Sequence, residues 1–140
     1  MYNRILVALE NGPADQVVVP HVSALARQFH SEILLVHVAD GFAARNFDQL
    51  KLAESAEMRH DREYLEGVAL RLRGDGLVVE VELALGNPPT EIVRSAKAHQ
   101  CDLIALTSHG HKLIGDLFLG STIDKVRHNT EIPLLIVRGK

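Results

Sequence analysis

The sequence has one cysteine and no apolar run long enough to cross a membrane, and each of these absences excludes a class of protein. Cys101 has no second thiol in the chain to pair with, so an internal disulfide is excluded. Its place at the start of an apolar run predicts a buried, unreactive thiol. No segment approaches the roughly 20 apolar residues of a membrane span, and the apolar run at the N-terminus is too short for a signal peptide. We therefore expect a cytoplasmic protein.

Neither sign of charge dominates the sequence. It has 18 acidic and 15 basic residues, spread along the chain, and a formal net charge of −3. Nucleic-acid and anionic-membrane binding usually need a basic patch, so neither partner is expected. The length of 140 residues and the hydrophobic content of 46% suit a single globular domain over residues 1–140. We find no internal repeat, low-complexity segment or linker.

Short apolar runs alternate with longer amphipathic stretches. The apolar runs predict five strands, at residues 4–9, 32–38, 77–85, 101–106 and 133–137. Four of them are almost continuously apolar, as is typical of a parallel sheet covered on both faces. The run at 77–85 instead alternates, with Glu80 and Glu82 on one face, which favours a strand near a sheet edge.

The amphipathic stretches predict four helices, at about residues 15–30, 48–73, 90–100 and 115–128. Pro20 either marks the first turn of its helix or kinks it, and the glycine-rich residues 73–76 predict a helix stop. Helices that alternate with buried strands indicate an α/β fold: an open five-stranded parallel sheet with right-handed crossovers and helices on both faces. In such sheets, ligands bind at the carboxyl ends of the strands, where the strand order reverses.

One candidate ligand loop follows the fourth predicted strand. Gly110 is followed by nine residues and then by Gly120, Ser121 and Thr122. Glycine turns and helix starts bind phosphate through converging backbone N–H groups. The same residues also suit an ordinary strand-to-helix connection in which Ser121 only caps the helix. The residues alone leave both interpretations open.

Several segments of the chain resemble the universal stress protein family, nearly from end to end. They are ILVAL (5–9), LLVHV (34–38), the stretch 86–106, SHG (108–110), FLGST (118–122) and IPLLIV (132–137). The ATP-binding branch of that family carries the motif G-x2-G-x9-G-[ST]. Three of its four positions match here, and Thr107 replaces the first glycine. Two further departures are Glu10, where the family usually has aspartate, and Thr122, where it usually has valine.

The resemblance implies a stress-response regulatory protein that binds ATP, or an ADP or AMP derivative, with Mg²⁺ as a candidate companion ion. It implies a Rossmann-like sheet of order 3-2-1-4-5 with the nucleotide across the strand ends. Ala8, Leu9 and Glu10 would then line the adenine and ribose, and Val38 would offer main-chain contacts to the adenine edge. Leu106 and Thr107 would lie under the ribose. The phosphates would meet Gly110, His111, Gly120, Ser121 and Thr122.

The resemblance also implies a homodimer. In a sheet of this order the last strand lies at an edge, and family members commonly dimerise there. The residues expected at this dimer edge are Leu134, Leu135, Ile136 and Val137.

Two other function classes remain open. The first is an interaction or structural protein of the same fold that works through its dimer surface without a nucleotide, which Thr107 and Glu10 favour. The second is an enzyme. No G-x-S-x-G elbow surrounds Ser121, and the G-x-x-x-x-G-K-[ST] phosphate loop is absent. We therefore expect no catalytic residues and at most slow ATP hydrolysis.

Four other polar residues, His37, Arg45, His109 and His111, have a less specialised interpretation. His109 and His111 have only Asp116 nearby as a further ligand, so we expect no metal site from protein residues alone. His37, inside an apolar strand, predicts a hydrogen-bonded core histidine. Arg45 is expected to be a solvated loop residue.

Overall fold

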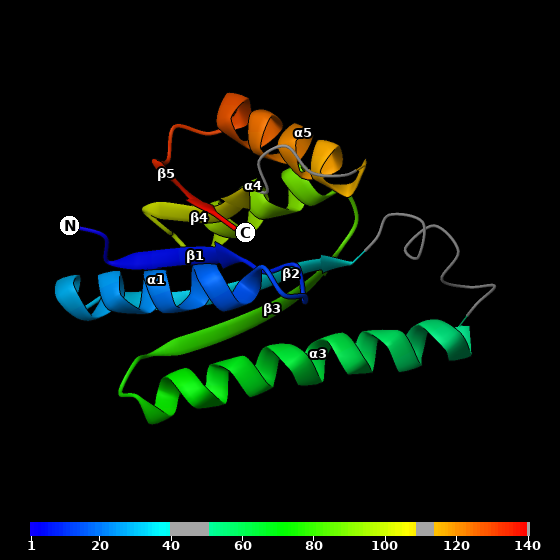
Figure 1. Cartoon of the computed structure of the whole chain (residues 1–140), viewed down its shortest axis with the longest axis horizontal. Coiled ribbons are helices and arrows are strands. Elements are labelled where there is room, and N and C mark those ends of the chain that lie inside the picture. Colours follow the sequence, from blue (N-terminus) through cyan, green and yellow to red (C-terminus); the bar gives the residue numbers. More distant parts are fainter. Residues whose placement is uncertain (40–50, 109–113, 140) are drawn as a thin grey trace.

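Five parallel strands form the centre of the molecule (Figure 1). The structure is a computed structural model that describes residues 1–39, 51–108 and 114–139, with residues 51–55 and 114–120 described by their backbone alone. The sheet order is β3-β2-β1-β4-β5, as expected, and every neighbouring pair is parallel. The strands are β1 (Arg4–Ala8), β2 (Glu32–Ala39), β3 (Val79–Leu85), β4 (Leu103–Ser108) and β5 (Leu134–Arg138).

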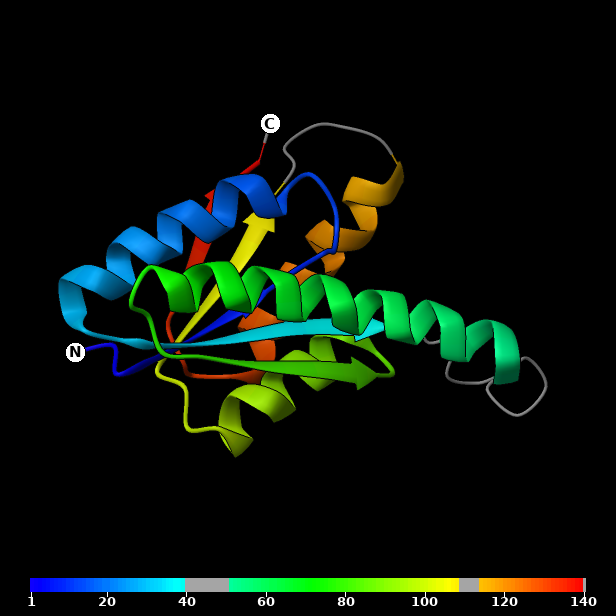
Figure 2. The ribbon, with the colours of Figure 1, turned by 90° about the horizontal axis from the view of Figure 1, so that it is seen from below.

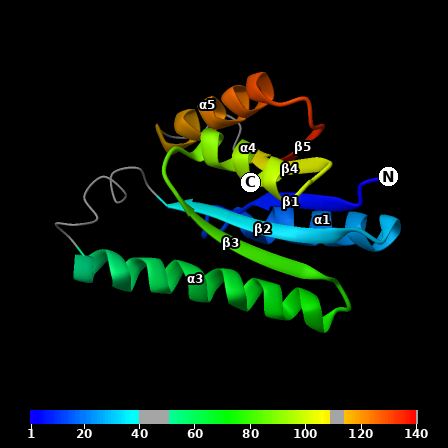
Figure 3. The ribbon, with the colours of Figure 1, turned by 180° about the vertical axis from the view of Figure 1, so that it is seen from behind.

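Helices cover both faces of the sheet. They are α1 (Asp15–Phe29), α3 (Lys51–Gly74), α4 (Pro88–Ala98) and α5 (Ile114–Asn129). Figure 2 shows α1 and α3 side by side over one face, and Figure 3 shows α4 and α5 on the other side of the strands. Within the described residues, no helix is both long and apolar enough to span a bilayer.

The central strands are apolar on both sides because each face packs against two helices. Residues such as Leu35 and Val7 face α1 and α3, where they pack with Val18 and Leu65. Leu34 and Ile104 point the other way and join the cluster that includes Ile92, Val126 and other residues of α4 and α5. Burying a side chain of this size stabilises the fold by about 1.5–3 kcal/mol. The continuously apolar runs of the sequence have their explanation in these two cores.

Helix α4 begins two residues before the expected position. Asn87 is its N-cap, and its side-chain oxygen accepts from the backbone N–H of Thr90 at 3.3 Å. Pro88 and Pro89 occupy the first turn, where the N–H that proline lacks has no helical partner anyway. The expectation that Thr90 opens the helix was therefore wrong by half a turn.

Two other details refine the expectations from the sequence. Pro20 lies inside α1 and not in its first turn. Strand β4 begins at Leu103, so Cys101 lies just before it, although its thiol is buried as expected. The glycine-rich stop after α3 is present, and Gly76 adopts the left-handed φ of +90° that favours glycine.

Candidate functional site

A pocket lies at the carboxyl edge of the sheet, where the strand order reverses. Strand β1 is central, with β2 on one side and β4 on the other, so the crossovers leave toward opposite faces and a crevice opens between them. The pocket has a volume of about 220 Å³. Its lining residues are Ala8, Leu9, Glu10, Val36, His37, Val38, Pro88, Ile92, Leu106, Thr107, Thr122 and Ile123.

The structure brings together many of the residues expected at a nucleotide site. Seven of them line the pocket: Ala8, Leu9, Glu10, Val38, Leu106, Thr107 and Thr122. Gly120 and Ser121 belong to α5, and the exposed Ser121 is not part of the lining. Gly110 and His111 lie outside the described residues, as do Arg45 and His109.

The α4 side of the pocket was not foreseen from the sequence. Pro88 and Ile92 form this wall, four residues apart and therefore on one face of the helix. Ile123 of α5 and Val36 of β2 complete it. The i, i+4 spacing at the start of α4 is the sequence signal that could have found the first two residues.

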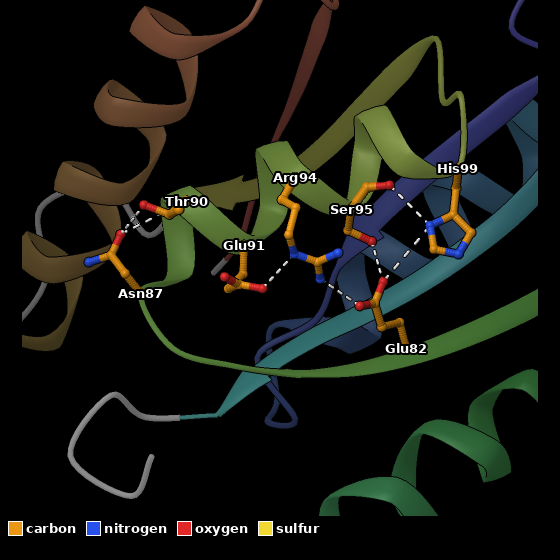
Figure 4. A network of polar contacts seen from close by, with 7 residues as sticks. All are labelled: Glu82, Asn87, Thr90, Glu91, Arg94, Ser95 and His99. Carbon is orange, nitrogen blue, oxygen red and sulfur yellow. Dashed lines mark hydrogen bonds and ion pairs between the residues drawn. The ribbon is translucent and has the colours of Figure 1, made fainter. Parts of the chain in front are cut away.

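A network of hydrogen bonds and ion pairs links α4 to the edge strand β3 (Figure 4). Ser95 and Arg94 of α4 both donate hydrogen bonds to the carboxylate of Glu82, and Arg94 also pairs with Glu91 at 2.7 Å. Burial by itself would raise the pKa of Glu82, but the hydrogen bonds from Ser95 and Arg94 outweigh it, and the pKa is lowered. Glu82 is therefore held as a carboxylate, and the network keeps α4 at a fixed distance from the sheet.

Thr107 stands where the resemblance to the universal stress protein family places the first glycine of the ATP-binding motif. Its side chain is 4% exposed, and its Oγ1 atom has no hydrogen-bond partner within the described part of the chain. The methyl group of Thr107 fills the space beside Gly139, just after β5. A Cβ atom added to Gly139 would lie only 3.1 Å from the methyl carbon. The substitution therefore places a methyl group and an unsatisfied hydroxyl in a buried position at the pocket.

His37 is a hydrogen-bonded histidine, as expected, but it also lines the pocket. Its Nδ1 atom lies 2.9 Å from the carbonyl oxygen of Leu9, which can only accept, so Nδ1 carries the proton. Its Nε2 atom lies 3.8 Å from the carboxylate of Asp61 on α3. This contact across two elements connects the pocket lining to α3.

The remaining titratable candidates lie away from the pocket. Cys101 lies just before β4, at the amino-terminal ends of the strands and therefore away from the pocket. Burial raises the pKa of its thiol to about 11, so the thiol is protonated and unreactive at neutral pH. Among the described residues, no group of three histidine, cysteine or carboxylate side chains is placed to hold a metal ion.

The fold and the pocket define an open-sheet α/β protein with a pocket at its topological switch point. A match over residues 1–138 to the model of the universal stress protein family shows that the chain belongs to that family. Universal stress protein Sll1388 of Synechocystis is 27% identical over 151 aligned residues that cover 98% of each chain.

Solved structures agree with this assignment. The structure of MJ0577 from Methanocaldococcus jannaschii has a TM-score of 0.86, with 25% identity over 100% of this chain and 98% of that one. A universal stress protein in complex with cAMP has a TM-score of 0.74, with 17% identity over 99% of this chain and 98% of that one. The Archaeoglobus fulgidus protein in complex with dAMP has a TM-score of 0.69, with 21% identity over 97% and 98%. The last two similarities establish the fold alone.

Proposed function

We propose that this chain binds an adenine nucleotide, with ATP as the first candidate, and acts as a regulatory protein of the stress response in the cytoplasm. The observation that carries the proposal is the pocket at the carboxyl ends of β1, β2 and β4. Its lining includes seven residues that the family resemblance assigns to a nucleotide. Family members in complex with cAMP and dAMP support an adenine nucleotide as the ligand class.

The dimensions and chemistry of the pocket suggest how the nucleotide would lie. Ligand pockets usually measure about 300–1,000 Å³, so a pocket of 220 Å³ accommodates one end of a ligand and leaves the other end outside. Its apolar wall, which includes Val36, Ile92 and Leu106, suits the flat face of adenine. Glu10 offers carboxylate oxygens that accept hydrogen bonds from ribose hydroxyls.

The phosphates would then extend toward the start of α5. The backbone N–H of Gly110 is one proposed donor, because glycine turns bind phosphate oxygens well. The hydroxyl of Ser121, which is exposed on α5, is a second. The N–H groups of Gly120, Ser121 and Thr122 lie inside α5 and donate to carbonyls of the preceding turn, so they are not proposed as phosphate donors. Mg²⁺ would be brought with the phosphates. We propose no catalytic residue.

Calorimetric titration tests the proposal. ATP is titrated with Mg²⁺ and, separately, with EDTA into the wild-type protein and into the Gly120→Val and Thr107→Gly variants. We expect binding in the roughly micromolar range for wild type. Gly120→Val should abolish binding because the added side chain blocks close approach of the phosphates. Thr107→Gly should bind ATP at least as tightly as wild type.

Other results of this titration would change the proposal. If only Thr107→Gly binds ATP, the pocket is disabled at position 107 in the natural chain. If none of the three proteins binds, the nucleotide proposal is wrong.

A second candidate function has its own supporting observation. Strand β5 lies at the edge of the sheet, and Ile136 on it is 41% exposed. We propose that two chains pair through Leu134, Leu135, Ile136 and Val137 to form a homodimer. If the pocket does not bind nucleotide, this surface would carry the function as an interaction module.

A further inference from the structure

A buried carboxylate organises the turn that leads from β1 into the pocket. Asp15, the first residue of α1, is only 2% exposed. Its two oxygens accept from the backbone N–H groups of Glu10 at 2.9 Å, Asn11 at 2.9 Å and Gly12 at 3.3 Å. Three converging amides form a cradle for a negative charge, and here an internal side chain occupies it. The conformation of residues 10–12 therefore depends on Asp15.

Helix α3 holds the same turn from the other side. The hydroxyl of Tyr64 donates to Oδ2 of Asp15 at 2.8 Å. One turn earlier on α3, Oδ1 of Asp61 accepts from the side-chain amide of Asn11 at 3.1 Å. Residues three apart lie on one face of a helix, so α3 contacts the turn at two adjacent points. Burial, together with the hydrogen bond to Asp15, raises the pKa of Tyr64, and its hydroxyl stays a donor at physiological pH.

The turn carries a residue of the pocket. Glu10 lines the pocket, and its own N–H is one of the three held by Asp15. The preceding residue is also anchored, because the N–H of Leu9 donates to the carbonyl of Val36 at 2.8 Å and the carbonyl of Leu9 accepts from His37. Asn11 has a left-handed φ of +57°, a conformation that asparagine adopts more readily than most other non-glycine residues.

We propose that Tyr64 and Asp15 are positioning residues for the ligand site, and that they act on the bound ligand through Glu10. The proposal rests on the proposed nucleotide site. It adds a residue of α3, Tyr64, that influences ligand affinity although it does not line the pocket. Asp15 sets the backbone position of Glu10, and Tyr64 sets the orientation of Asp15. Loss of the Tyr64 hydroxyl leaves the carboxylate less constrained, and the position of Glu10 against the ligand becomes less well defined.

A double-mutant cycle on ATP affinity tests this coupling. The four proteins are wild type, Tyr64→Phe, Glu10→Ala and the double variant. Tyr64→Phe should weaken ATP binding about fivefold, within the range that one hydrogen bond contributes. In the Glu10→Ala background the same change should alter affinity less than about twofold, because no carboxylate remains to be positioned. Equal effects in both backgrounds would show that Tyr64 does not act through Glu10, and would overturn the proposal.

The chain offers a matched control for the loss of a tyrosine hydroxyl. Tyr2 stacks edge-on against Phe29 with ring centroids 5.5 Å apart, just before β1 and at the end of the strand away from the pocket. Tyr2→Phe removes the same atom and should leave ATP affinity unchanged. An equal loss in Tyr2→Phe would assign the effect to general destabilisation and overturn the positioning role.

Amide hydrogen exchange tests the positioning role without any nucleotide. The N–H groups of Glu10, Asn11 and Gly12 should exchange about threefold or more faster in Tyr64→Phe than in Tyr2→Phe, because their acceptor is less constrained. Unchanged exchange would overturn the proposal regardless of ATP binding. If wild type does not bind ATP, the proposed function fails, and faster exchange in Tyr64→Phe still supports control of the turn by α3.

Discussion

At the scale of single residues, the hydroxyl of Thr107 is a buried polar group with a missing partner. Its Oγ1 atom is covered by protein and lacks a hydrogen-bond partner among the described residues. An unsatisfied buried hydroxyl costs about 1–3 kcal/mol, because water solvates it in the unfolded chain. The residue that departs from the family motif therefore lowers the stability of the strand end that carries the pocket.

Replacing Thr107 with valine should therefore stabilise the protein. Valine keeps the branched shape and the methyl group beside Gly139, removes the hydroxyl, and suits a strand. We expect the free energy of unfolding to rise by about 1 kcal/mol, measured by urea denaturation. Thr107→Ser is the control: it keeps the hydroxyl, loses the packed methyl group, and should lower stability by about 1 kcal/mol. A valine variant no more stable than wild type would contradict this account of Thr107.

At the scale of elements, the Glu82 network joins α4 to β3 and should make this junction sensitive to acid. The folded-state pKa of Glu82 is lowered, so its contribution to stability is full above the ordinary glutamate pKa of 4.5 and is lost as the pH falls through the lowered value. Glu82→Gln should reduce stability at pH 7 and should lose less further stability than wild type between about pH 5 and pH 3.

Denaturation curves at several pH values measure this difference. Glu80→Gln is the matched control, because Glu80 lies on the same strand and is exposed. It should leave the acid profile close to that of wild type. An identical acid profile for Glu82→Gln and wild type would mean that the network does not depend on the carboxylate charge.

The elements themselves could be predicted well from the sequence, but the contacts between them could not. Each strand and helix boundary falls within about three residues of its expected place, because the apolar periodicity follows directly from burial. The edge position of β3 followed from the alternation at Glu80 and Glu82. By contrast, Asp15 and Tyr64 are 49 positions apart. No spacing rule indicates which face of α3 meets the turn after β1, so the network behind Glu10 became visible only in the folded chain.

At the scale of the whole molecule, strand β5 should govern association. An edge strand has unpaired backbone groups along one side, and Ile136 adds an exposed apolar side chain. We expect Ile136→Lys to shift the protein from dimer to monomer in sedimentation velocity, because pairing of two such edges would bring the introduced charges together. Leu70→Lys is the control: Leu70 on α3 is 70% exposed, and its replacement should not change the association state. A wild-type chain that sediments as a monomer would refute the dimer.

The two edges of the sheet differ in character. The β3 edge carries the exposed Glu80, and the nearby Glu82 binds Arg94 and Ser95 of α4. The β5 edge is apolar over Leu134–Val137 and has one charged residue, the exposed Arg138, at its end. Charged side chains at an edge discourage the addition of further strands. When two β5 edges pair about a two-fold axis, the apolar edge of each chain is covered. The edges that stay exposed in such a dimer are the two β3 edges, which carry Glu80. If two chains pair in this way, growth by strand addition would end at the dimer, and the protein would not form filaments by this route.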